Sequence, residues 1–406
     1  MANLFQGITS GFAELKNNYE GPIVDLLSED LPVYRAAEKI KKGWSGYQVV
    51  RPLRIRRNQG IGATTDGGNL PAIGRQSTQQ ALIQAKFNYL RFGVTGPMIK
   101  ASMSDAGSFV RSAAYELEMG YKDLRSDLNR QYSWDGTGTL ATVASNVAAS
   151  TSVSITGRES VEQALKFVDI GLVFDIYTSA GVLVQQGITV NSISSGTPNS
   201  SSATIVCNVP VTASANNVLV RSGSYGNEIQ GMLLSQDGGT STIYGVDRST
   251  VLSYQGNVVD AAGAVLSLDA IQNVTNLVRR RSGEKVDAYY MDFDTERYYQ
   301  KLLTADKRFV NTMEGDGGFA KKGETYLQFN GIPLISDKDC PQRWFILNQE
   351  SWKNYVLCEM EFADETGTMY IAQTSADAYE VRLRFFSNLF PENPSANGVL
   401  KGYVSP

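Results

Sequence analysis

Residues 104–134, SDAGSFVRSAAYELEMGYKDLRSDLNRQYSW, form the longest uninterrupted helical pattern in this chain. Ser104 can cap the start, and Asp105 lies in the first turn, where the helix dipole favours negative charge. Gly136 and Gly138 follow, so the pattern predicts a rod of roughly 45 Å that ends before these glycines. The side chains that recur at steps of three and four, and so share one helical face, are Val110, Ala114, Leu117, Tyr121, Leu124, Leu128 and Tyr132. A core helix of an ordinary mixed domain would show the same pattern.

The composition limits the classes of function. The chain has 406 residues, enough for two or three domains. Its net charge of −4 argues against a broad surface that neutralises nucleic-acid phosphates. It has no histidine, which removes the commonest general base and the commonest zinc ligand. We find no signal peptide and no stretch approaching the ~18–20 apolar residues of a membrane span, so we expect no membrane association and synthesis in a cytoplasm.

The cysteines are Cys207, Cys340 and Cys358. An odd, widely spaced set is typical of a reducing compartment and indicates neither a disulfide framework nor a zinc site. We expect them to be small buried hydrophobes, and we expect no cofactor.

The N-terminal residues 1–46 have the pattern of an arm. Two short amphipathic pieces, 22–27 and 33–40, contain too few apolar residues to close a core of their own. Trp44 and Tyr47 indicate that at least the end of the arm docks on something. A floppy terminus is the alternative.

Residues 47–99 predict a long two-stranded hairpin. The outgoing strand is 47–57, the returning strand is 81–94, and the intervening 59–77 is rich in Gly, Thr and Ala, as in a mobile tip. The outgoing strand carries four arginines, Arg51, Arg54, Arg56 and Arg57, and the returning strand carries Phe87, Tyr89 and Arg91. Such a ribbon is marginal alone. The arginines either protect a solvated edge or lie on a neighbouring subunit.

Residues 139–226 predict a β-rich module. The first part, 139–160, is Ala, Ser, Thr and Val with almost no charge. Short strands separated by turn signals are expected at 172–177, 182–186, 188–193, 203–209 and 217–221. This spacing indicates a small barrel or sandwich inserted between larger elements.

Residues 227–376 return to an α/β pattern. A helix is expected at 268–281, with Ser267 as its cap and Gly283 as its stop. A second helix, 295–304, has Asp294 as its expected cap. Strands are expected at 286–293, 326–335, 344–348 and 369–372, then at 379–386 with strong alternation, and possibly at 399–403.

Candidate chemistry is sparse. The glycine-rich segments 60–68 and 318–323 lack the lysine and the following helix of a phosphate loop, so both are interpreted as turns. Asp292 and Asp294 lie at a strand end, where paired carboxylates can bind a metal or act as acid and base, although a helix cap explains Asp294. The three cations Arg279, Arg280 and Arg281 end a helix, where they offset its dipole or contact another subunit or a phosphate.

Taken in order, these stretches resemble the major capsid protein of tailed bacteriophages, an α+β protein of the Hong Kong 97-type fold. The segments that carry the resemblance are NYEGPIVDLL (18–27) with DLP (30–32), KFNYLRFGVTGPMI (86–99), DAGSFV (105–110), WDGTG (134–138) and FNGIPLI (329–335). Each motif is weak by itself, and their order along nearly the whole chain is the evidence.

The resemblance implies a domain plan and partners. It implies an N-terminal arm (1–46), an extended β-hairpin loop (47–99), a spine helix of a peripheral domain (100–138), the inserted module (139–226), an axial domain (227–376), and a closing strand of the peripheral domain with the C-terminal tail (377–406). It implies identical subunits in hexamers and pentamers that form an icosahedral shell in the virion, with a portal protein and possibly scaffold or decoration proteins. The shell would enclose double-stranded DNA without sequence-specific binding.

From the resemblance and the residue patterns together we expect no enzyme activity. The expected contacts between subunits involve Trp44, Arg51, Arg54, Arg56, Arg57, Phe87, Tyr89, Arg91, Arg279, Arg280 and Arg281. We also expect the arm and the hairpin to find their apolar partners on neighbouring copies. Some family members join subunits covalently through a loop lysine, but Lys86 alone lies between 46 and 99, so no crosslink is expected. A β-rich surface adhesin, and an enzyme that uses Asp292 and Asp294, are the alternatives.

Overall fold

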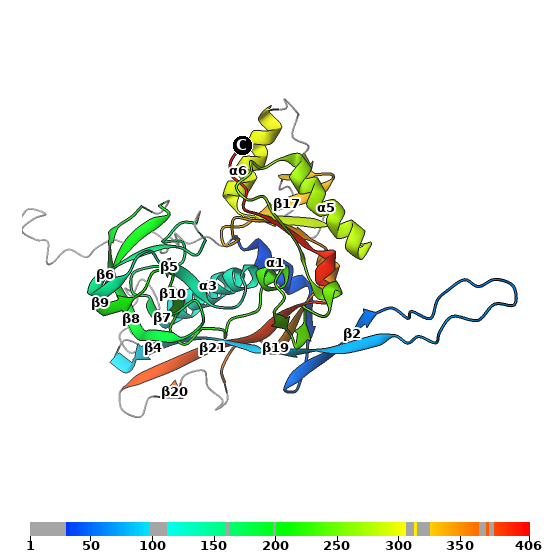
Figure 1. Ribbon diagram of the computed structural model, residues 1–406. Helices are drawn as coiled ribbons and strands as arrows, with labels where there is room; N and C mark the ends of the chain where they lie inside the picture. Colours follow the sequence, from blue (N-terminus) through cyan, green and yellow to red (C-terminus); the bar gives the residue numbers. More distant parts are fainter. Residues whose placement is uncertain are drawn as a thin grey trace, which may run out of the picture.

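The structure is a computed structural model that describes residues 30–97, 112–159, 162–197, 200–305, 312–314, 325–364, 371–372 and 377–406. It is an α+β fold. Helix α3 (Ser112–Ser133) lies over a long sheet, with a β-barrel to one side, an α/β region above, and a hairpin that projects from the body (Figure 1).

Helix α3 is the predicted rod, and it ends at Ser133 as expected. Leu124, Leu128 and Tyr132 are buried in the main core, whereas Tyr121 is 37% exposed and leaves the predicted stripe. The expected start at Ser104, with its cap, lies outside the described residues.

The end of the arm docks on its own chain. Helix α1 (Pro32–Lys39) buries Val33, Tyr34 and Ala37 in the main core, and β1 (Lys41–Gly43) pairs in parallel with β19 (Trp352–Phe362). The first N–H groups of α1 are satisfied from distant parts of the chain: Val33 donates to Asp337 at 3.3 Å and Tyr34 donates to Asn129 at 2.9 Å. The expectation that the arm finds its partners on a neighbour is therefore wrong for residues 30–46, and the piece at 22–27 lies outside the described residues.

A five-stranded sheet lies beneath α3. Its order is β1-β19-β21-β20, with β21 (Ala378–Pro391) also pairing with β4 (Lys86–Thr95) and β20 spanning Ile371–Ala372. The predicted returning strand of the hairpin is thus divided. Only β3 (Ser77–Gln84) pairs with β2 (Gln48–Arg56), while β4 continues from it and pairs with the closing strand. The outgoing strand is paired with β3 along its whole length, so the hairpin ends at Gln84 and residues 86–95 are left to pair with β21.

The inserted module is a closed six-stranded barrel in the order β10-β5-β6-β9-β8-β7. Its strands are β5 (Thr139–Val143), β6 (Val147–Gly157), β7 (Val173–Tyr177), β8 (Leu183–Ser195), β9 (Ser202–Ala213) and β10 (Val218–Arg221). The strands β5 and β6 fall in the segment 139–160, for which no strand was predicted. The expected strands at 182–186 and 188–193 are one strand, because Gly187 at φ +69° bends the chain without ending it. The barrel has its own core, separate from the main core.

The α/β region is built on a second sheet in the order β13-β22-β18-β14-β17-β16-β15. Its strands are β13 (Asn257–Asp260), β22 (Gly398–Lys401), β18 (Trp344–Leu347), β14 (Ala288–Met291), β17 (Ile332–Ser336), β16 (Thr325–Phe329) and β15 (Thr312–Glu314). Helices α5 (Leu268–Ser282) and α6 (Phe293–Ala305) pack on this sheet around Trp344 and Tyr289. The shorter elements are α4 (Met232–Gln236), β11 (Thr242–Ile243), β12 (Val246–Asp247), η1 (Leu252–Tyr254), η2 (Gln349–Ser351) and η3 (Pro394–Ala396).

The domain boundaries remain predictions, but the strand pairing crosses them. The strand β19 lies within the expected axial segment 227–376, yet it pairs with the closing strand β21. Conversely β22, in the expected tail, lies between β13 and β18 of the second sheet. Sequence position alone does not reveal such exchanges.

Helix α5 begins and ends as predicted. The Ala270 N–H donates to Ser267 Oγ at 3.1 Å, and Gly283 adopts φ +76° at the C-cap. We expect Ser267→Ala to lower the free energy of unfolding by about 1 kcal/mol, because it leaves an orphan N–H without its cap. Urea unfolding of the variant and the wild type measures this loss of free energy. Ser253 is exposed, so the control Ser253→Ala should change the free energy of unfolding by no more than ~0.5 kcal/mol. Equal effects for the two variants would contradict the capping role.

Two local predictions are wrong. The expected strand 326–335 is a hairpin, because Asn330 (φ +53°) and Gly331 (φ +76°) form a tight turn between β16 and β17, as an Asn-Gly pair favours. Helix α6 is capped by Asp292, which accepts the Thr295 N–H at 3.2 Å, and not by Asp294. Asp294 lies two residues beyond the cap, in the first turn of the helix, and instead pairs with Arg297 at 2.8 Å.

Candidate assembly surfaces

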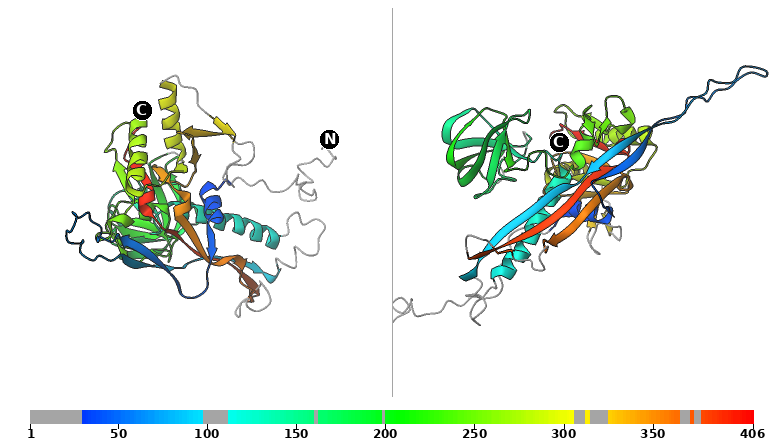
Figure 2. Two further views of the ribbon diagram at one scale, coloured as in Figure 1. Left: turned by 90° about the vertical axis from the view of Figure 1, so that its right-hand side faces the viewer. Right: turned by 90° about the horizontal axis from the view of Figure 1, so that it is seen from below.

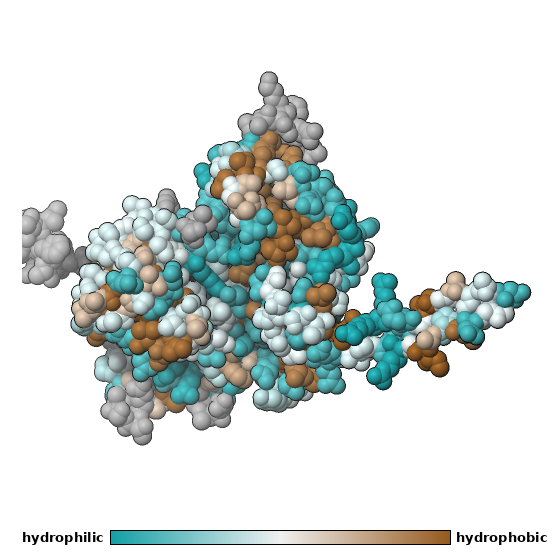
Figure 3. Space-filling view, viewed as in Figure 1, coloured by the Kyte–Doolittle hydropathy of each residue, from teal (hydrophilic) through white to brown (hydrophobic). Residues whose placement is uncertain are grey.

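The hairpin tip, residues 57–76, projects beyond the body (Figures 1 and 2). No regular strand continues into it. Ile61, Leu70 and Ile73 are 87%, 86% and 103% exposed, and brown side chains are visible along the projection in Figure 3. Large aliphatic groups so fully in water forgo about 1.5–3 kcal/mol each compared with burial. The tip is therefore a surface that another body can cover.

The base of the hairpin, by contrast, is anchored on its own chain. Ala81 and Ile83 are fully buried, and Val49, Leu53 and Ile55 are partly buried, against a core that includes Tyr244 and Phe390. The Leu82 N–H also donates to the Tyr244 carbonyl at 2.8 Å. The expectation that the hairpin buries its apolar face on a neighbour is therefore wrong for the base, and it stays a prediction for the tip.

The predicted interface arginines of the hairpin have different environments. Arg51 forms an ion pair with Glu392 of its own chain at 2.8 Å. Arg54, Arg56 and Arg57 are exposed along the outgoing strand and the start of the tip.

The outer face of the five-stranded sheet carries the predicted Phe87, Tyr89 and Arg91. Phe87 and Tyr89 are each 57% exposed, and both rings contact Phe386 edge-on at centroid distances of 5.0 and 5.3 Å. Arg91 donates two hydrogen bonds to Glu380, at 2.8 and 3.1 Å. Hydrogen bonds from Arg382, and then from Arg91, hold the pKa of Glu380 below its usual value. Exposed aromatic rings beside arginines are the residue types that dominate protein interfaces.

An open cleft of about 1730 Å³ lies beside β4, bounded by the barrel and α3. Four consecutive residues of β4, 87–90, line it. Side chains of a strand alternate between two faces, so consecutive residues line one cleft only where that cleft runs along the edge of the strand. Within the described residues β4 pairs with β21 alone, which leaves this edge available to another extended segment.

Two of the other predicted interface residues, Trp44 and Arg281, contact their own chain. Trp44 is half-buried, with its ring 6.1 Å from that of Tyr355. Arg281 donates to Asn257 at 2.7 Å and to the Leu252 carbonyl at 2.8 Å, and burial lowers its pKa. Arg279 and Arg280 are exposed at the end of α5. Trp44 and Arg281 therefore stabilise their own chain.

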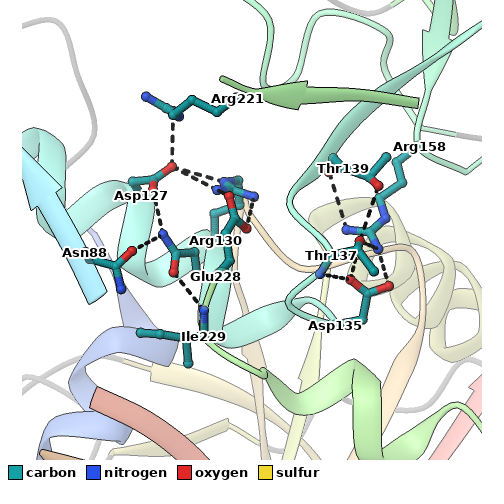
Figure 4. Close-up of polar contacts among 11 residues, drawn as sticks. Asn88, Asp127, Arg130, Asp135, Thr137, Thr139, Arg158, Arg221, Glu228 and Ile229 are labelled. Atoms are coloured by element: carbon teal, nitrogen blue, oxygen red, sulfur yellow. Dashed lines mark hydrogen bonds and ion pairs between the residues drawn. The ribbon is translucent and has the colours of Figure 1, made fainter. Parts of the chain in front are cut away.

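A polar network that was not predicted from the sequence fastens the barrel to α3 (Figure 4). Arg130 donates to both oxygens of Glu228, at 3.0 and 2.6 Å, and to Asp127 at 3.1 Å. Arg221 of β10 pairs with the same Asp127 at 3.2 Å. Burial alone would raise the pKa of Asp127, but Arg130 and Arg221 outweigh it, so this pKa lies below its usual value. The partners are up to 98 residues apart in sequence, so no local sequence pattern predicts that they pair.

A second set of contacts ties the other side of the barrel to the body. Arg158, at the end of β6, pairs with Asp135, and its guanidinium lies 4.3 Å from the centre of the Trp134 ring. Arg343 of the body pairs with Glu159. With two separate attachments, the barrel is held in one orientation relative to α3.

The buried carboxyl group of Glu162 makes the stability of this junction depend on pH. Burial raises its pKa from 4.5 to about 7, although Lys166 lies 3.5 Å away. The folded state therefore holds a proton that the unfolded state releases between pH 4.5 and 7, so the free energy of unfolding falls as pH rises through this window. We expect Glu162→Gln to stabilise the chain by about 2 kcal/mol at pH 8 and by almost nothing at pH 4. The melting temperatures of the variant and the wild type, compared at pH 4 and pH 8, measure this stabilisation. An equal difference in melting temperature at the two pH values would contradict the raised pKa of Glu162.

The candidate catalytic groups have structural roles. Asp292 caps α6, and burial raises its pKa, while Asp294 pairs with Arg297. Among the described residues no group of three or more His, Cys, Asp or Glu side chains could bind a metal, and no helix could span a membrane. The segment 60–68 lies in the hairpin tip, and the segment 318–323 lies outside the described residues. Cys207 and Cys340 are buried, as expected, whereas Cys358 is partly exposed, and all three are free thiols.

Solved structures share this fold over their full length, although their sequences differ greatly. The chain is similar to a protein of the cyanophage A-1(L) capsid (TM-score 0.61, 11% identity, 98% of both chains) and to one of the capsid of the native GTA particle (TM-score 0.55, 8% identity, 100% of both chains). It is also similar to the SrpI encapsulin complex of Synechococcus elongatus (TM-score 0.50, 7% identity, 99% of this chain and 96% of that one). No family model and no curated protein sequence matches it. The chain therefore has the α+β fold of phage capsid proteins.

Proposed function

We propose that this chain is the structural subunit of a closed protein shell. The fold supports this, and the observation that carries it is the hairpin tip, which leaves a well-anchored base and holds Ile61, Leu70 and Ile73 in water. A monomer gains nothing from such a projection. A neighbouring copy that covers the tip recovers the burial energy of all three side chains.

The cleft beside β4 is the surface that we propose for the tip of the next copy. Within the described residues it offers a strand edge that pairs with no other strand, and the exposed rings of Phe87 and Tyr89. The tip in turn supplies extended backbone and aliphatic side chains. Each contact needs only modest affinity, because many identical contacts act together in a symmetric closed assembly.

Self-assembly tests this function directly. We expect the purified full chain to form large particles, or five- and sixfold rings, in gel filtration and negative-stain microscopy. A compact monomer at all concentrations would refute the shell and favour the adhesin or enzyme alternatives. Among the described residues, the barrel is the feature that suggests an adhesin, while Asp292 accepts the cap hydrogen bond of α6 and Asp294 pairs with Arg297.

In finer detail, we propose a phage-type icosahedral virion shell of hexamers and pentamers that encloses DNA, with portal, scaffold or decoration proteins as further partners. The cyanophage capsid structure, which has the highest TM-score of the three, supports this. An encapsulin-type compartment is the second candidate, because the SrpI structure has the same fold. Nuclease-protected DNA in native particles would identify the former, and enclosed protein without DNA the latter.

We expect the shell to contain no covalent crosslink between subunits. Burial lowers the pKa of Lys86, and its Nζ donates to the Gly226 carbonyl of its own chain at 2.7 Å, so this amine is engaged away from the tip. Boiled particles should give a single band at the 44.3 kDa chain mass on a denaturing gel. A ladder of higher bands would overturn this prediction.

A further inference from the structure

The projecting hairpin (Figure 2) is attached to the body along β3, where the turn between β11 and β12 supports it. The Tyr244 carbonyl accepts the Leu82 N–H at 2.8 Å, and the Gly245 carbonyl accepts a hydrogen bond from the Gln79 side chain at 3.4 Å. Among the hydrogen bonds of the described residues that join β3 to the body, these two lie nearest the tip.

Tyr244 has a backbone conformation that bulky side chains rarely adopt. Its φ is +49°, and Gly245 follows at φ +75°, so both central residues of the two-residue turn lie in the left-handed region. Such turns favour Asn, Asp or Gly, and a tyrosine in this conformation is strained. Strain of this kind persists where the surrounding contacts determine the conformation. We therefore expect the tyrosine side chain to make contacts that hold the turn in place.

The Tyr244 side chain connects the turn to the five-stranded sheet. It is 7% exposed, its ring contacts Phe390 edge-on at a centroid distance of 5.1 Å, and its hydroxyl donates to the Leu389 carbonyl at 2.6 Å. Both partners belong to β21. Tyr244 thus binds β3 through its backbone and β21 through its side chain.

A buried arginine fixes the loop that carries this turn. The Arg248 side chain is fully buried and donates to Asp237 at 2.7 Å, to the Ser241 carbonyl at 2.8 Å and to the Leu234 carbonyl at 3.3 Å. These partners precede β11, whereas Arg248 follows β12, so the contacts close the loop around the two short strands. The turn is therefore a fixed support for the hairpin.

We propose that Tyr244 is a positioning residue that fixes the direction in which the hairpin leaves the body, and with it the place where the tip meets the next copy. A further hydrogen bond, from the Asn388 side chain to the Gln84 carbonyl at 2.8 Å, lies nearer the body and leaves the hairpin free to tilt about it. Residues 66–79 span roughly 40 Å when extended at ~3.3 Å per residue, so a tilt of about 10° moves the end of the tip by roughly 7 Å. That displacement exceeds the ~4.8 Å spacing of paired strands, so a tilted tip misses the strand edge of its neighbour.

This inference rests on the proposed shell, because the direction of the tip matters only where a neighbouring copy receives it. The two fail in distinguishable ways. Absence of particles from the wild-type chain would refute the shell, whereas the direction of the hairpin is measured on single chains and tests the role of Tyr244 alone.

Distances between two nitroxide labels, measured by pulsed electron spin resonance, test the direction of the hairpin. In a Cys358→Ser background, whose two other cysteines are buried, Asn69→Cys places a label on the tip and Asn273→Cys places one on the exposed side of α5. In unassembled subunits, Tyr244→Ala should at least double the width of the distance distribution, whereas Tyr244→Phe, which keeps the ring, should retain the wild-type width. An unchanged width for Tyr244→Ala would refute the proposal.

The control Val278→Ala shows whether general destabilisation broadens the distribution. Val278 is fully buried in the core around α5, which contains no residue of the hairpin, so this variant should melt at a lower temperature and keep the wild-type width. Equal broadening by Val278→Ala and Tyr244→Ala would count against a positioning role, since both would then act through stability.

Assembly supplies a second test, in which a disulfide replaces the contacts of Tyr244. A Cβ atom at Gly245 would lie 3.9 Å from the Leu82 Cβ, within the range of a disulfide. We expect Tyr244→Ala to raise the protein concentration needed for assembly about tenfold. In the same chain with Cys358→Ser, oxidation of a Leu82→Cys, Gly245→Cys pair should restore assembly. The reduced form of that chain is the matched control, because it shares the strain of a cysteine at position 245, and crosslinked chains that assemble no better than reduced ones would overturn the proposal.

Discussion

Deletion of residues 58–75 is expected to give a folded, soluble chain that no longer closes shells. The base of the hairpin stays in place after this deletion, because Ala81 and Ile83 remain buried against Tyr244 and Phe390. The tip contributes nothing to that core and is the part of the described chain that extends farthest from the body (Figure 2). Assembly of the purified variant, followed by negative-stain microscopy, should therefore show small oligomers in place of particles.

A second variant removes the apolar side chains of the tip and leaves its length unchanged. Ile61→Ser, Leu70→Ser and Ile73→Ser together should weaken assembly strongly, since each removes ~1.5–3 kcal/mol of burial per contact, repeated over every copy. The matched control replaces Thr64, Thr65 and Asp66 with alanine in the same exposed tip and should assemble normally. Normal particles from the deletion variant would mean that the tip is dispensable and that subunits associate through other surfaces.

Removal of the Arg130 guanidinium is expected to have the largest effect on stability. Arg130 and Glu228 are each 4% exposed, so Arg130→Met leaves a buried carboxylate without its partner. Such a change costs about 3–5 kcal/mol. Denaturant unfolding of the unassembled chain should show this loss, and limited proteolysis should cut the links between barrel and body at 135–139 and 222–228 first.

Two further variants test whether the loss comes from the buried charge. The double variant Arg130→Met, Glu228→Gln should recover part of the stability, because no unpaired charge then remains at Glu228, and Asp127 keeps Arg221. The control Glu361→Gln disrupts the more exposed pair with Arg384 and should cost no more than about 1 kcal/mol. A loss for Arg130→Met as small as that of the control would show that the network does not stabilise the junction.

The candidate surfaces were only partly predictable. Exposed arginines and a glycine-rich tip could be recognised in the sequence, because alternation and turn composition are local signals. Trp44, Arg51 and Arg281 contact Tyr355, Glu392 and Asn257 of their own chain, and their expected place at an interface stays a prediction. Nothing in the local sequence distinguishes an arginine that meets a neighbour from one that meets a distant part of its own chain.

The same limit explains the missed network between the barrel and α3. Asp127 and Arg130 are ordinary helix residues by sequence, and Glu228 lies after the whole barrel. Only the closure of the barrel brings Glu228 and Arg221 back to α3.

The sequence by itself determined the local elements: the helix α3, the capped helix α5, the hairpin with its tip, and a β module between larger parts. Each depends on residues within a few positions of one another, where periodicity, caps and turns act directly. Only the tertiary structure decided that β4 leaves the hairpin for β21, that β22 enters the second sheet, and that α1 docks on its own body. These outcomes depend on competition between strands and surfaces far apart in the chain, and such a competition is resolved by packing the whole molecule.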